Sequence, residues 1–189
     1  MGLELELKYA ATPDVLREIA REFGDFSTIS METTYFDTAD RSLSNQKMTL
    51  RRRFENGTSV CTLKTPAGGF ARGEWDVCAD WSEATVLGLF SNAGIQPVAF
   101  EQLQRLCGAK FTRLAKQIEL PGCTVELALD EGILFGGGRE IPLCELEVEL
   151  KAGEQNALVY WATALSAKYG LVPEKKSKFK RASALVSGE

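Results

Sequence analysis

The sequence contains no histidine, and this absence removes several kinds of active site at once. Without an imidazole group the chain has no Ser-His-Asp triad, no zinc site built on histidine and no histidine general base. Its five cysteines form no CxxC pair, the spacing typical of dithiol and zinc motifs. Any chemistry here must therefore use carboxylates, lysine, arginine and a metal ion.

Long uncharged stretches are also missing. No segment reaches the roughly 18 apolar residues that a membrane span needs, and Glu4, Glu6 and Lys8 interrupt the apolar run of a signal peptide. The formal net charge of −4 argues against a general nucleic-acid binder, which is normally basic. An odd number of cysteines favours a reducing compartment. We therefore expect a cytoplasmic protein without membrane or nucleic-acid partners, whose oligomeric state the sequence leaves open.

The 189 residues have the size of one domain, so 1–189 is taken as a single unit. Caps, apolar faces and closing glycines predict helices at 13–23, 82–92, 100–107 and 154–169. Eight strands are predicted in the rest of the chain, at 2–9, 31–37, 47–55, 58–65, 73–80, 110–120, 123–131 and 139–151. Tight turns at Asn56-Gly57 and Pro121-Gly122 indicate hairpins. This pattern favours an α+β fold whose largely antiparallel strands form a closed or nearly closed barrel.

Charged and apolar residues alternate along several predicted strands. Side chains at i and i+2 share a strand face, so Glu4, Glu6 and Lys8 lie opposite the leucines between them. The same rule groups other charges: Arg51 with Arg53, Glu126 with Asp130, and Glu145 with Glu147 and Glu149. A sheet with one solvent-exposed face also shows such alternation. An inner face is favoured because each strand carries mainly one sign of charge, and because the apolar helices need the leucine faces to cover.

A barrel lined by both signs of charge suits a phosphate chain with metal ions. Arginine binds phosphate oxygens through a bidentate fork and lysine as a point charge. Carboxylates would repel phosphate, so we expect them to hold Mg²⁺ or Mn²⁺, which prefer oxygen ligands. Further charges between these strands are Lys64, Arg72, Glu74 and Asp76. The residues alone thus predict a metal-dependent site for a multiply charged phosphate chain.

Several different short motifs follow one another along the chain. They are Glu4-x-Glu6-x-Lys8, Tyr35-Phe36-Asp37-Thr38, Leu50-Arg51-x-Arg53, Thr62-Leu63-Lys64, Arg72-x-Glu74, Arg113, the acidic strands 126–132 and 144–150, and Ser177-Lys178 with Arg181. Together they resemble the CYTH superfamily, also called the triphosphate tunnel metalloenzymes. An isolated ExExK arises by chance in alternating strands, whereas this ordered series is specific.

The resemblance implies an eight-stranded antiparallel closed barrel, the triphosphate tunnel, with surrounding helices and a short C-terminal helix that plugs one mouth. The implied reaction is hydrolysis of the terminal phosphate of a triphosphate. Its catalytic positions would be Glu4, Glu6, Lys8 and Glu147. The triphosphate would be bound by Lys8, Arg51, Arg53, Lys64, Arg72, Arg113, Lys178 and Arg181. Mg²⁺ or Mn²⁺ would be held by Glu4, Glu6, Glu145, Glu147 and Glu149, with Glu74, Glu126 and Asp130 in support.

The acidic strands are most similar to those of the bacterial branch typified by inorganic triphosphatase, where a helical CHAD domain often follows; none is expected within 1–189. Inorganic tripolyphosphate is the first substrate expected. Class IV adenylate cyclase, nucleoside or thiamine triphosphatase, and a binding module without turnover remain alternatives. No adenine-binding element is recognisable, and Trp75 and Trp81, the aromatics considered for thiamine, are expected in the core or at the rim. Arg52 is predicted to point outward as a solvated cation.

Overall fold

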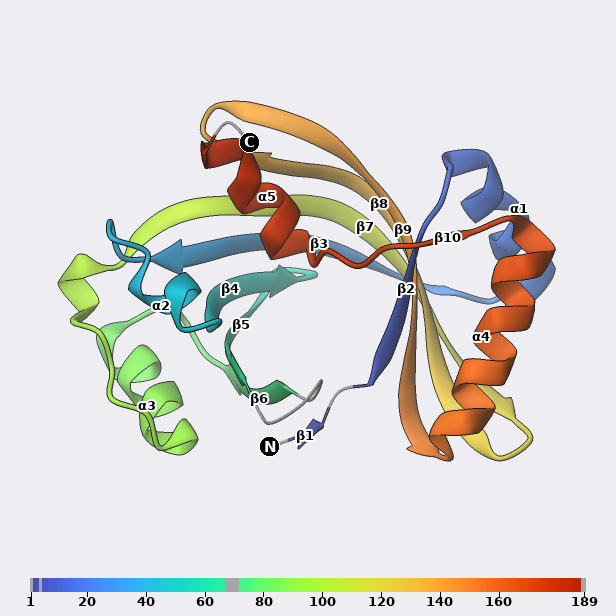
Figure 1. The fold of residues 1–189 in the computed structure, drawn as a ribbon, viewed down its shortest axis with the longest axis horizontal. Coiled ribbons are helices and arrows are strands. Elements are labelled where there is room, and N and C mark those ends of the chain that lie inside the picture. The colour runs from blue at the N-terminus through green and yellow to red at the C-terminus, as the bar shows by residue number, and fades with distance from the viewer. Residues whose placement is uncertain (1, 4, 67–71, 188–189) are drawn as a thin grey trace.

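The computed structural model of the protein describes residues 2–3, 5–66 and 72–187, which form one curved antiparallel sheet with helices on it (Figure 1). The strands are β1 (Gly2–Leu3), β2 (Glu6–Ala10), β3 (Ser27–Asp37), β4 (Thr49–Glu55), β5 (Thr58–Pro66), β6 (Arg72–Cys78), β7 (Gln104–Leu120), β8 (Cys123–Gly136), β9 (Arg139–Gly153) and β10 (Val172–Pro173). The helices are α1 (Pro13–Phe23), α2 (Ser42–Asn45), α3 (Glu83–Ala93), α4 (Gln155–Tyr169) and α5 (Lys178–Ser187).

The sheet has the strand order β1-β6-β5-β4-β3-β7-β8-β9-β2-β10. The segment predicted as one strand at 2–9 is two strands with different partners, because β1 pairs with β6 whereas β2 pairs with β9. In the described part of the chain no hydrogen-bonded ladder joins β1 to β2 or β10. The α+β class is therefore confirmed, while a closed barrel is not.

Helices α1 and α3 begin where their capping residues predict. The Oγ1 atom of Thr12 accepts a hydrogen bond from the backbone N–H of Val15 at 3.3 Å, and Ser82 Oγ accepts one from Thr85 at 3.2 Å. The hairpin predicted at Asn56-Gly57 joins β4 to β5, since both residues adopt the positive φ angles, 49° and 85°, that a tight hairpin turn requires. These elements follow from local sequence alone.

The helix predicted at 100–107 is wrong. A single 3₁₀ turn occupies Phe100–Gln102, and β7 already begins at Gln104. Gln104 pairs with Asp37 at the far end of β3, beyond a bulge in the ladder. Pairing with a strand about 65 residues away in the sequence outweighs the local apolar spacing, which is the usual way that tertiary context overrides propensity.

The apolar face of β8 and β9 lies under α1 and α4. Leu127, Leu146 and Val148 are fully buried there, together with Ile19 of α1 and Leu158 of α4. Burying side chains of this size stabilises the fold by roughly 2 kcal/mol each. Because successive strand residues point to opposite faces, the carboxylates between these apolar residues are turned to the inner face, as the alternation predicts.

Helix α5 covers one end of that inner face (Figure 1). Phe179 and Ala182 of α5 pack in one cluster with Phe111 of β7, which lies on the same strand face as Arg113. A Cβ added at Gly136 would lie 2.7 Å from the carbonyl oxygen of Ala182, so only glycine allows the helix backbone to approach β8 this closely. A short C-terminal helix, which the family resemblance implies, is therefore present and lies on the inner face of the sheet.

Helix α2 was not predicted, and a single buried carboxylate organises it. Asp37 is 1% exposed and accepts hydrogen bonds from the backbone N–H groups of Thr38 at 2.8 Å, Leu43 at 2.9 Å and Ser44 at 3.1 Å. The hydroxyl of Ser44 donates to it at 2.5 Å. Within the Tyr35-Phe36-Asp37-Thr38 motif, the aspartate therefore has a structural role.

Asp37→Ala should lower the free energy of unfolding by about 3 kcal/mol, because four donors would lose a buried acceptor. Equilibrium unfolding in urea measures this loss. Asp40→Ala is the matched control: its carboxylate accepts from the hydroxyls of Thr38 and Ser42 near the surface, and its loss should cost less than about 1 kcal/mol. Equal losses for the two variants would contradict the structural role of Asp37.

None of the helices in the described ranges is long and apolar enough to cross a membrane. The five cysteines are free thiols, and three of them, Cys61, Cys107 and Cys123, are buried. Burial raises the pKa of the Cys107 thiol to about 12. At neutral pH this thiol is protonated and unreactive, as is usual for a cysteine that serves as a small core side chain.

Candidate functional site

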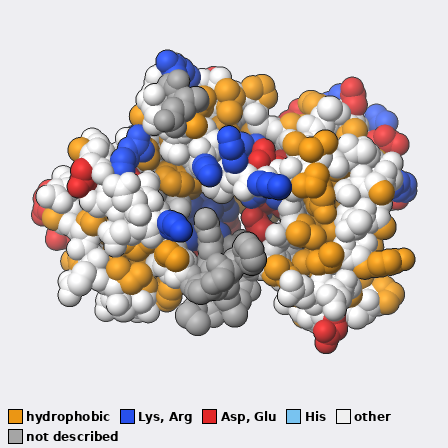
Figure 2. All heavy atoms as spheres, in the orientation of Figure 1, with side chains coloured by type: hydrophobic (Ala, Val, Ile, Leu, Met, Phe, Trp, Pro, Cys, Tyr) orange, Lys and Arg blue, Asp and Glu red, His pale blue; other side chains and the backbone are white. Residues whose placement is uncertain are grey.

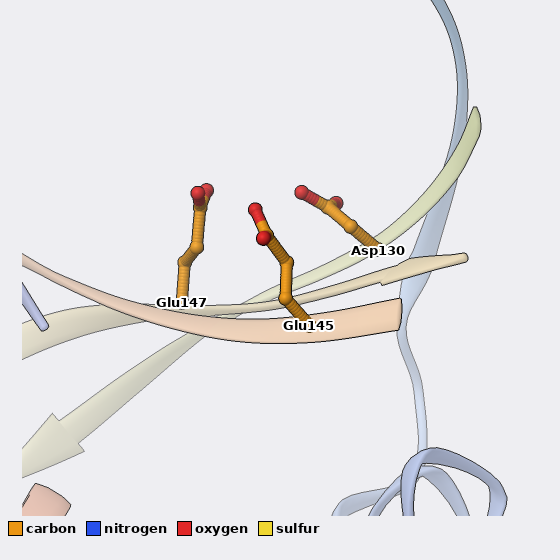
Figure 3. A group of neighbouring side chains, drawn as sticks. All are labelled: Asp130, Glu145 and Glu147. Carbon is orange, nitrogen blue, oxygen red and sulfur yellow. The ribbon is translucent and has the colours of Figure 1, made fainter. Parts of the chain in front are cut away.

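Three carboxylates meet on the inner face of β8 and β9: Asp130, Glu145 and Glu147 (Figure 3). One oxygen atom of each lies within 4.8 Å of the others. Asp130 and Glu145 are fully buried, and Glu147 is 8% exposed. The register pairs Asp130 with Glu145 across the two strands, and Glu147 follows two residues later on the same face. These three residues are called the acidic cluster below.

Lys178, the first residue of α5, inserts its ammonium group into the acidic cluster. Its Nζ atom lies 2.7 Å from Asp130 Oδ2 and 2.8 Å from Glu147 Oε1, and it also forms an ion pair with Glu145. The whole residue is only 6% exposed. One cation therefore contacts all three carboxylates.

Two arginines complete the charge balance around the cluster. Arg113 of β7 donates to Asp130 from Nε at 2.8 Å and from a terminal nitrogen at 2.7 Å, and it reaches Glu147 at 2.5 Å. Arg181 of α5 pairs with Glu145. Three buried carboxylates thus have three cations in direct contact, the arrangement that makes buried carboxylates tolerable.

These contacts shift the pKa values of the participants. Burial raises the pKa of Glu147, but Lys178, Arg113 and Lys8 outweigh it and hold this pKa well below its usual value. For Glu145, burial together with the charge of Glu147 raises the pKa, although Lys178 opposes the shift. Burial lowers the pKa of the Lys178 ammonium, yet the facing carboxylates raise it above its ordinary value. Glu147 and Lys178 are consequently charged at neutral pH.

A cavity of about 330 Å³ adjoins the cluster at Arg113. Figure 2 shows Lys and Arg side chains gathered around a hollow near the middle of one face, with Asp and Glu side chains within it. The residues that line the cavity are Arg51, Arg53, Glu55, Val60, Thr62, Glu74, Asp76, Arg113 and Glu149. Among the described residues, its wall contains one apolar side chain and no aromatic ring. It is called the charged cavity below.

The arginines of the charged cavity have unused capacity to bind an anion. A terminal nitrogen of Arg51 lies 3.3 Å from Glu74, whose other oxygen is 3.1 Å from Lys64. The Nε atom of Arg51 is buried without a hydrogen-bond partner in the described part of the chain. Burial and the nearby charge of Arg51 lower the pKa of Arg53 to about 10. Neighbouring guanidinium groups that repel one another favour an anion between them.

The residues present suit both a phosphate chain and a divalent ion. Guanidinium groups match phosphate oxygens in geometry and charge. The acidic cluster offers only carboxylate oxygens, the ligands preferred by Mg²⁺ and Mn²⁺. Arg113 lines the charged cavity and also binds the acidic cluster, so the two parts share one wall.

A comparison with protein families matches this chain to the CYTH domain over residues 2–183. The chain belongs to the CYTH family. The family resemblance seen in the ordered motifs is therefore confirmed over nearly the full sequence.

Individual proteins are also similar to this CYTH chain. The inorganic triphosphatase of Haemophilus influenzae is 29% identical over 197 residues, an alignment that covers 97% of this chain and 55% of the relative. The chain thus spans about half the length of that relative. A candidate adenylyl cyclase from Hippeastrum, described as having a dominant triphosphatase activity, has a TM-score of 0.68 at 19% identity, covering 100% of this chain and 97% of that chain. A protein of Pyrococcus horikoshii OT3 has a TM-score of 0.65 at 22% identity, covering 98% and 99%. The two structural similarities concern the fold.

The predicted metal ligands of the CYTH domain do not all meet. Glu145 and Glu147 belong to the acidic cluster, whereas Glu149 lies farther along β9, on the wall of the charged cavity and 2.8 Å from Lys151. Glu6 is turned toward Lys8, at 3.2 Å. Glu4 lies outside the described residues.

Asp130, predicted only as a supporting residue, is a full member of the acidic cluster. Its position depends on the pairing of β8 with β9, whose register is fixed by the two-residue turn Gly137-Gly138. That turn is the signal that could have found Asp130. Glu126, the other predicted support on β8, lies 3.8 Å from Lys151 and is half-buried at some distance along the strand. The sequence shows only that Glu126 and Asp130 are four residues apart on one strand face. This spacing does not indicate which of the two belongs to the acidic cluster.

The residues predicted to bind triphosphate divide between the two parts of the site. Arg51, Arg53 and Arg113 line the charged cavity, and Lys64 joins it through Glu74. Three others lie at the acidic cluster: Lys178 and Arg181 contact it directly, and Lys8 is 4.0 Å from Glu147. The side chain of Arg72 on β6 lies outside the described part.

Arg52 points away from these residues, as the alternation predicts. Its guanidinium carbon lies 4.7 Å from the ring centre of Phe54 on the outer face. The side chain is half-buried, so the prediction of a solvated cation is wrong in that respect. Two threonines at the site were missed: Thr33 accepts from Arg53 Nε at 3.1 Å, and Thr62 donates to Asp76 at 2.5 Å. Nothing in their residue type distinguishes them from other strand threonines.

Proposed function

We propose that this protein is a metal-dependent triphosphatase that removes the terminal phosphate of inorganic tripolyphosphate. The observation that carries the proposal is the contact of Arg113 with both parts of the site, because it joins a cavity that suits phosphate to a carboxylate cluster that suits a divalent ion. Membership of the CYTH family and similarity to a protein named inorganic triphosphatase support it.

In this proposal the phosphate chain lies in the charged cavity. Arg51, Arg53 and Arg113 donate to its oxygens, and Lys8 and Lys64 add positive charge at the edges. Phosphoryl transfer depends mainly on positioning and on stabilising charge, so the reaction does not need a histidine base. Glu74, which now lies between Arg51 and Lys64, would keep both side chains aligned when they turn to phosphate.

The acidic cluster would hold Mg²⁺ or Mn²⁺, with Glu4, Glu6 and Glu149 as further proposed ligands. When bound, such an ion neutralises phosphate oxygens and lowers the pKa of water. The low pKa of Glu147 keeps this carboxylate ionised and available as a ligand at neutral pH. In the structure, Arg113 orients Asp130 and Glu147 through its three hydrogen bonds, before any ion is bound.

We further propose that the sheet encloses the phosphate chain as a tunnel. Strands β1 and β2 follow each other in the chain, but β1 pairs with β6 at one end of the sheet and β2 pairs with β9 near the other end. Because β1 and β2 are only a few residues apart in the sequence, the two ends of the sheet must lie close together. This supports a closed barrel around the inner face.

The composition of the cavity wall favours an inorganic substrate over one with a base or thiamine group. Trp75 and Trp81 pack in the cluster under α3, where Trp81 stacks on Phe36 with ring centres 3.7 Å apart. Neither ring lines the charged cavity. Of the lining residues only Val60 is apolar, so the described wall offers a base little surface on which to stack.

A substrate panel tests this proposal. With Mg²⁺ or Mn²⁺ present, kcat/KM for phosphate release from tripolyphosphate should exceed the values for ATP and thiamine triphosphate by about tenfold or more, as specific polar sites discriminate at least this well. Removal of the metal with EDTA should abolish release. Faster hydrolysis of ATP, formation of cyclic AMP, or binding without any turnover would each contradict the proposal.

A further inference from the structure

The Lys178 ammonium group lies at the position in the acidic cluster where the proposed divalent ion would bind. The ammonium group of Lys178 lies 2.7 Å from Asp130 and 2.8 Å from Glu147 and pairs with Glu145, within a group whose oxygens lie within 4.8 Å of one another. These are the same carboxylates that a divalent ion would use. An ammonium group and a metal ion repel each other, so both cannot take these oxygens together.

The balance of charge decides which ligand can enter. In the structure, the cations Lys178, Arg113 and Arg181 match the three carboxylates in number and contact them directly. A metal ion that entered alone would leave these buried cations without partners, which is costly. A phosphate chain that entered alone would meet uncompensated carboxylates. When both enter, the carboxylates turn to the metal and the cations to phosphate, so every charge keeps a partner.

We propose that Lys178 is a built-in counter-ion that holds the metal-ligating carboxylates in the ligand-free protein and makes metal and triphosphate bind together. The inference rests on the proposed function for the identity of the two ligands. It assigns Lys178 a second task beyond contact with phosphate: it lowers the affinity of the site for a free divalent ion.

The placement of Lys178 suits such an exchange. It is the first residue of α5, and the helix is anchored separately, through Phe179 and Ala182 in the apolar cluster with Phe111. The lysine ammonium is a compact charge on a flexible stem, so it can leave the carboxylates without moving the helix. The ring of Phe111, with its centre 5.1 Å from Nζ, provides a further favourable contact for the cation.

Binding of Mn²⁺ without any phosphate compound, followed by electron paramagnetic resonance of the free ion, tests the proposal. Lys178→Met should bind Mn²⁺ about tenfold or more tightly than the unaltered protein, within the usual range of coupling between two ligands. Lys180→Met is the matched control on the same helix, because Lys180 is exposed and no ion pair of its side chain occurs among the described residues. It should bind Mn²⁺ like the unaltered protein, as should the charge-retaining Lys178→Arg.

Thermal unfolding of the unaltered protein gives a second measurement that does not depend on a folded Lys178→Met variant. Mn²⁺ alone and imidotriphosphate alone should each leave Tm nearly unchanged, while the two together should raise it by more than the sum of the separate effects. Independent, additive shifts would overturn the proposal, as would equal Mn²⁺ affinity of Lys178→Met and the unaltered protein.

The two proposals can fail separately. If tripolyphosphate is not hydrolysed but Lys178→Met still binds Mn²⁺ more tightly, the proposed function fails and the counter-ion role stands. If hydrolysis is normal and Mn²⁺ affinity does not depend on Lys178, only the counter-ion role fails.

Discussion

Glu147→Gln should reduce the turnover of tripolyphosphate by at least about 100-fold. Mutation of residues that only hydrogen-bond to a metal ligand already lowers metal affinity or activity by about 10- to 100-fold, and Glu147 is proposed to be a ligand itself. Glu147 contacts Arg113 at 2.5 Å and Lys178 at 2.8 Å, with Lys8 at 4.0 Å. The amide keeps the shape of the side chain but removes its charge. The metal ion would lose a ligand, and three cations would lose the carboxylate that holds them in place.

The measurement is the initial rate of phosphate release over a range of Mg²⁺ concentrations. The variant should show both a lower kcat and a higher metal concentration at half-maximal rate. Glu131→Gln is the matched control, because Glu131 follows Asp130 on β8 and is exposed. It should behave like the unaltered protein. Near-normal turnover by Glu147→Gln would exclude the proposed metal-binding role of this residue.

Arg53→Met should lower kcat/KM for tripolyphosphate by about 10- to 100-fold, the effect expected when a hydrogen bond to a charged group is lost. The Arg53 side chain is nearly buried on the wall of the charged cavity, where it would reach phosphate oxygens without having to leave water. Steady-state kinetics with tripolyphosphate and saturating Mg²⁺ measure the loss. Arg52→Met is an unusually close control, since Arg52 is the next residue and faces the other side of the sheet. It should change kcat/KM only slightly.

The same substitution should not weaken the ligand-free fold. The pKa of Arg53 is lowered to about 10 by burial and by Arg51, so its charged form is disfavoured in the folded protein. A cation with a lowered folded-state pKa costs stability at every pH below that pKa, including pH 7. We therefore expect the free energy of unfolding of Arg53→Met to equal or exceed that of the unaltered protein in urea. A large loss would show that Arg53 serves mainly to stabilise the fold.

This combination of lower activity with retained stability distinguishes a binding residue from a structural one. Asp37 provides the contrast: its four hydrogen bonds come from Thr38, directly after β3, and from Leu43 and Ser44 of α2. None of these residues lines the charged cavity or belongs to the acidic cluster. Proteins often hold unfavourable charge where they bind a ligand, and the ligand supplies the missing partner.

Much of the site was predictable because strand geometry is local. Alternation along one strand determines which side chains share a face, whatever the strand pairs with. It therefore placed Glu145 and Glu147 on one face and Leu146 and Val148 on the other, and it separated Arg52 from its two neighbours. The helix caps at Thr12 and Ser82 were predictable for the same reason, since a cap needs only the next three residues.

Relations between strands were not predictable, because they depend on register and docking. The pairing of Asp130 with Glu145 is an exception, because the Gly137-Gly138 turn between β8 and β9 fixes its register locally. Gln104, in contrast, extends β7 only through its pairing with Asp37 of β3. The docking of α5 on the inner face carries Lys178 into the acidic cluster. The contacts of Gln104 and Lys178 join residues too far apart in sequence for a local pattern to encode.

The sequence by itself determined which kinds of side chain are available for chemistry: no histidine, carboxylates alternating with leucines, and paired arginines, from which a site for phosphate and metal ions was predicted. Only the tertiary structure decided which charges meet. Composition and periodicity act along one strand, whereas the free energy of a buried charge depends on every partner within a few ångströms. For Lys178, those partners are three carboxylates from two strands that are far from it in sequence.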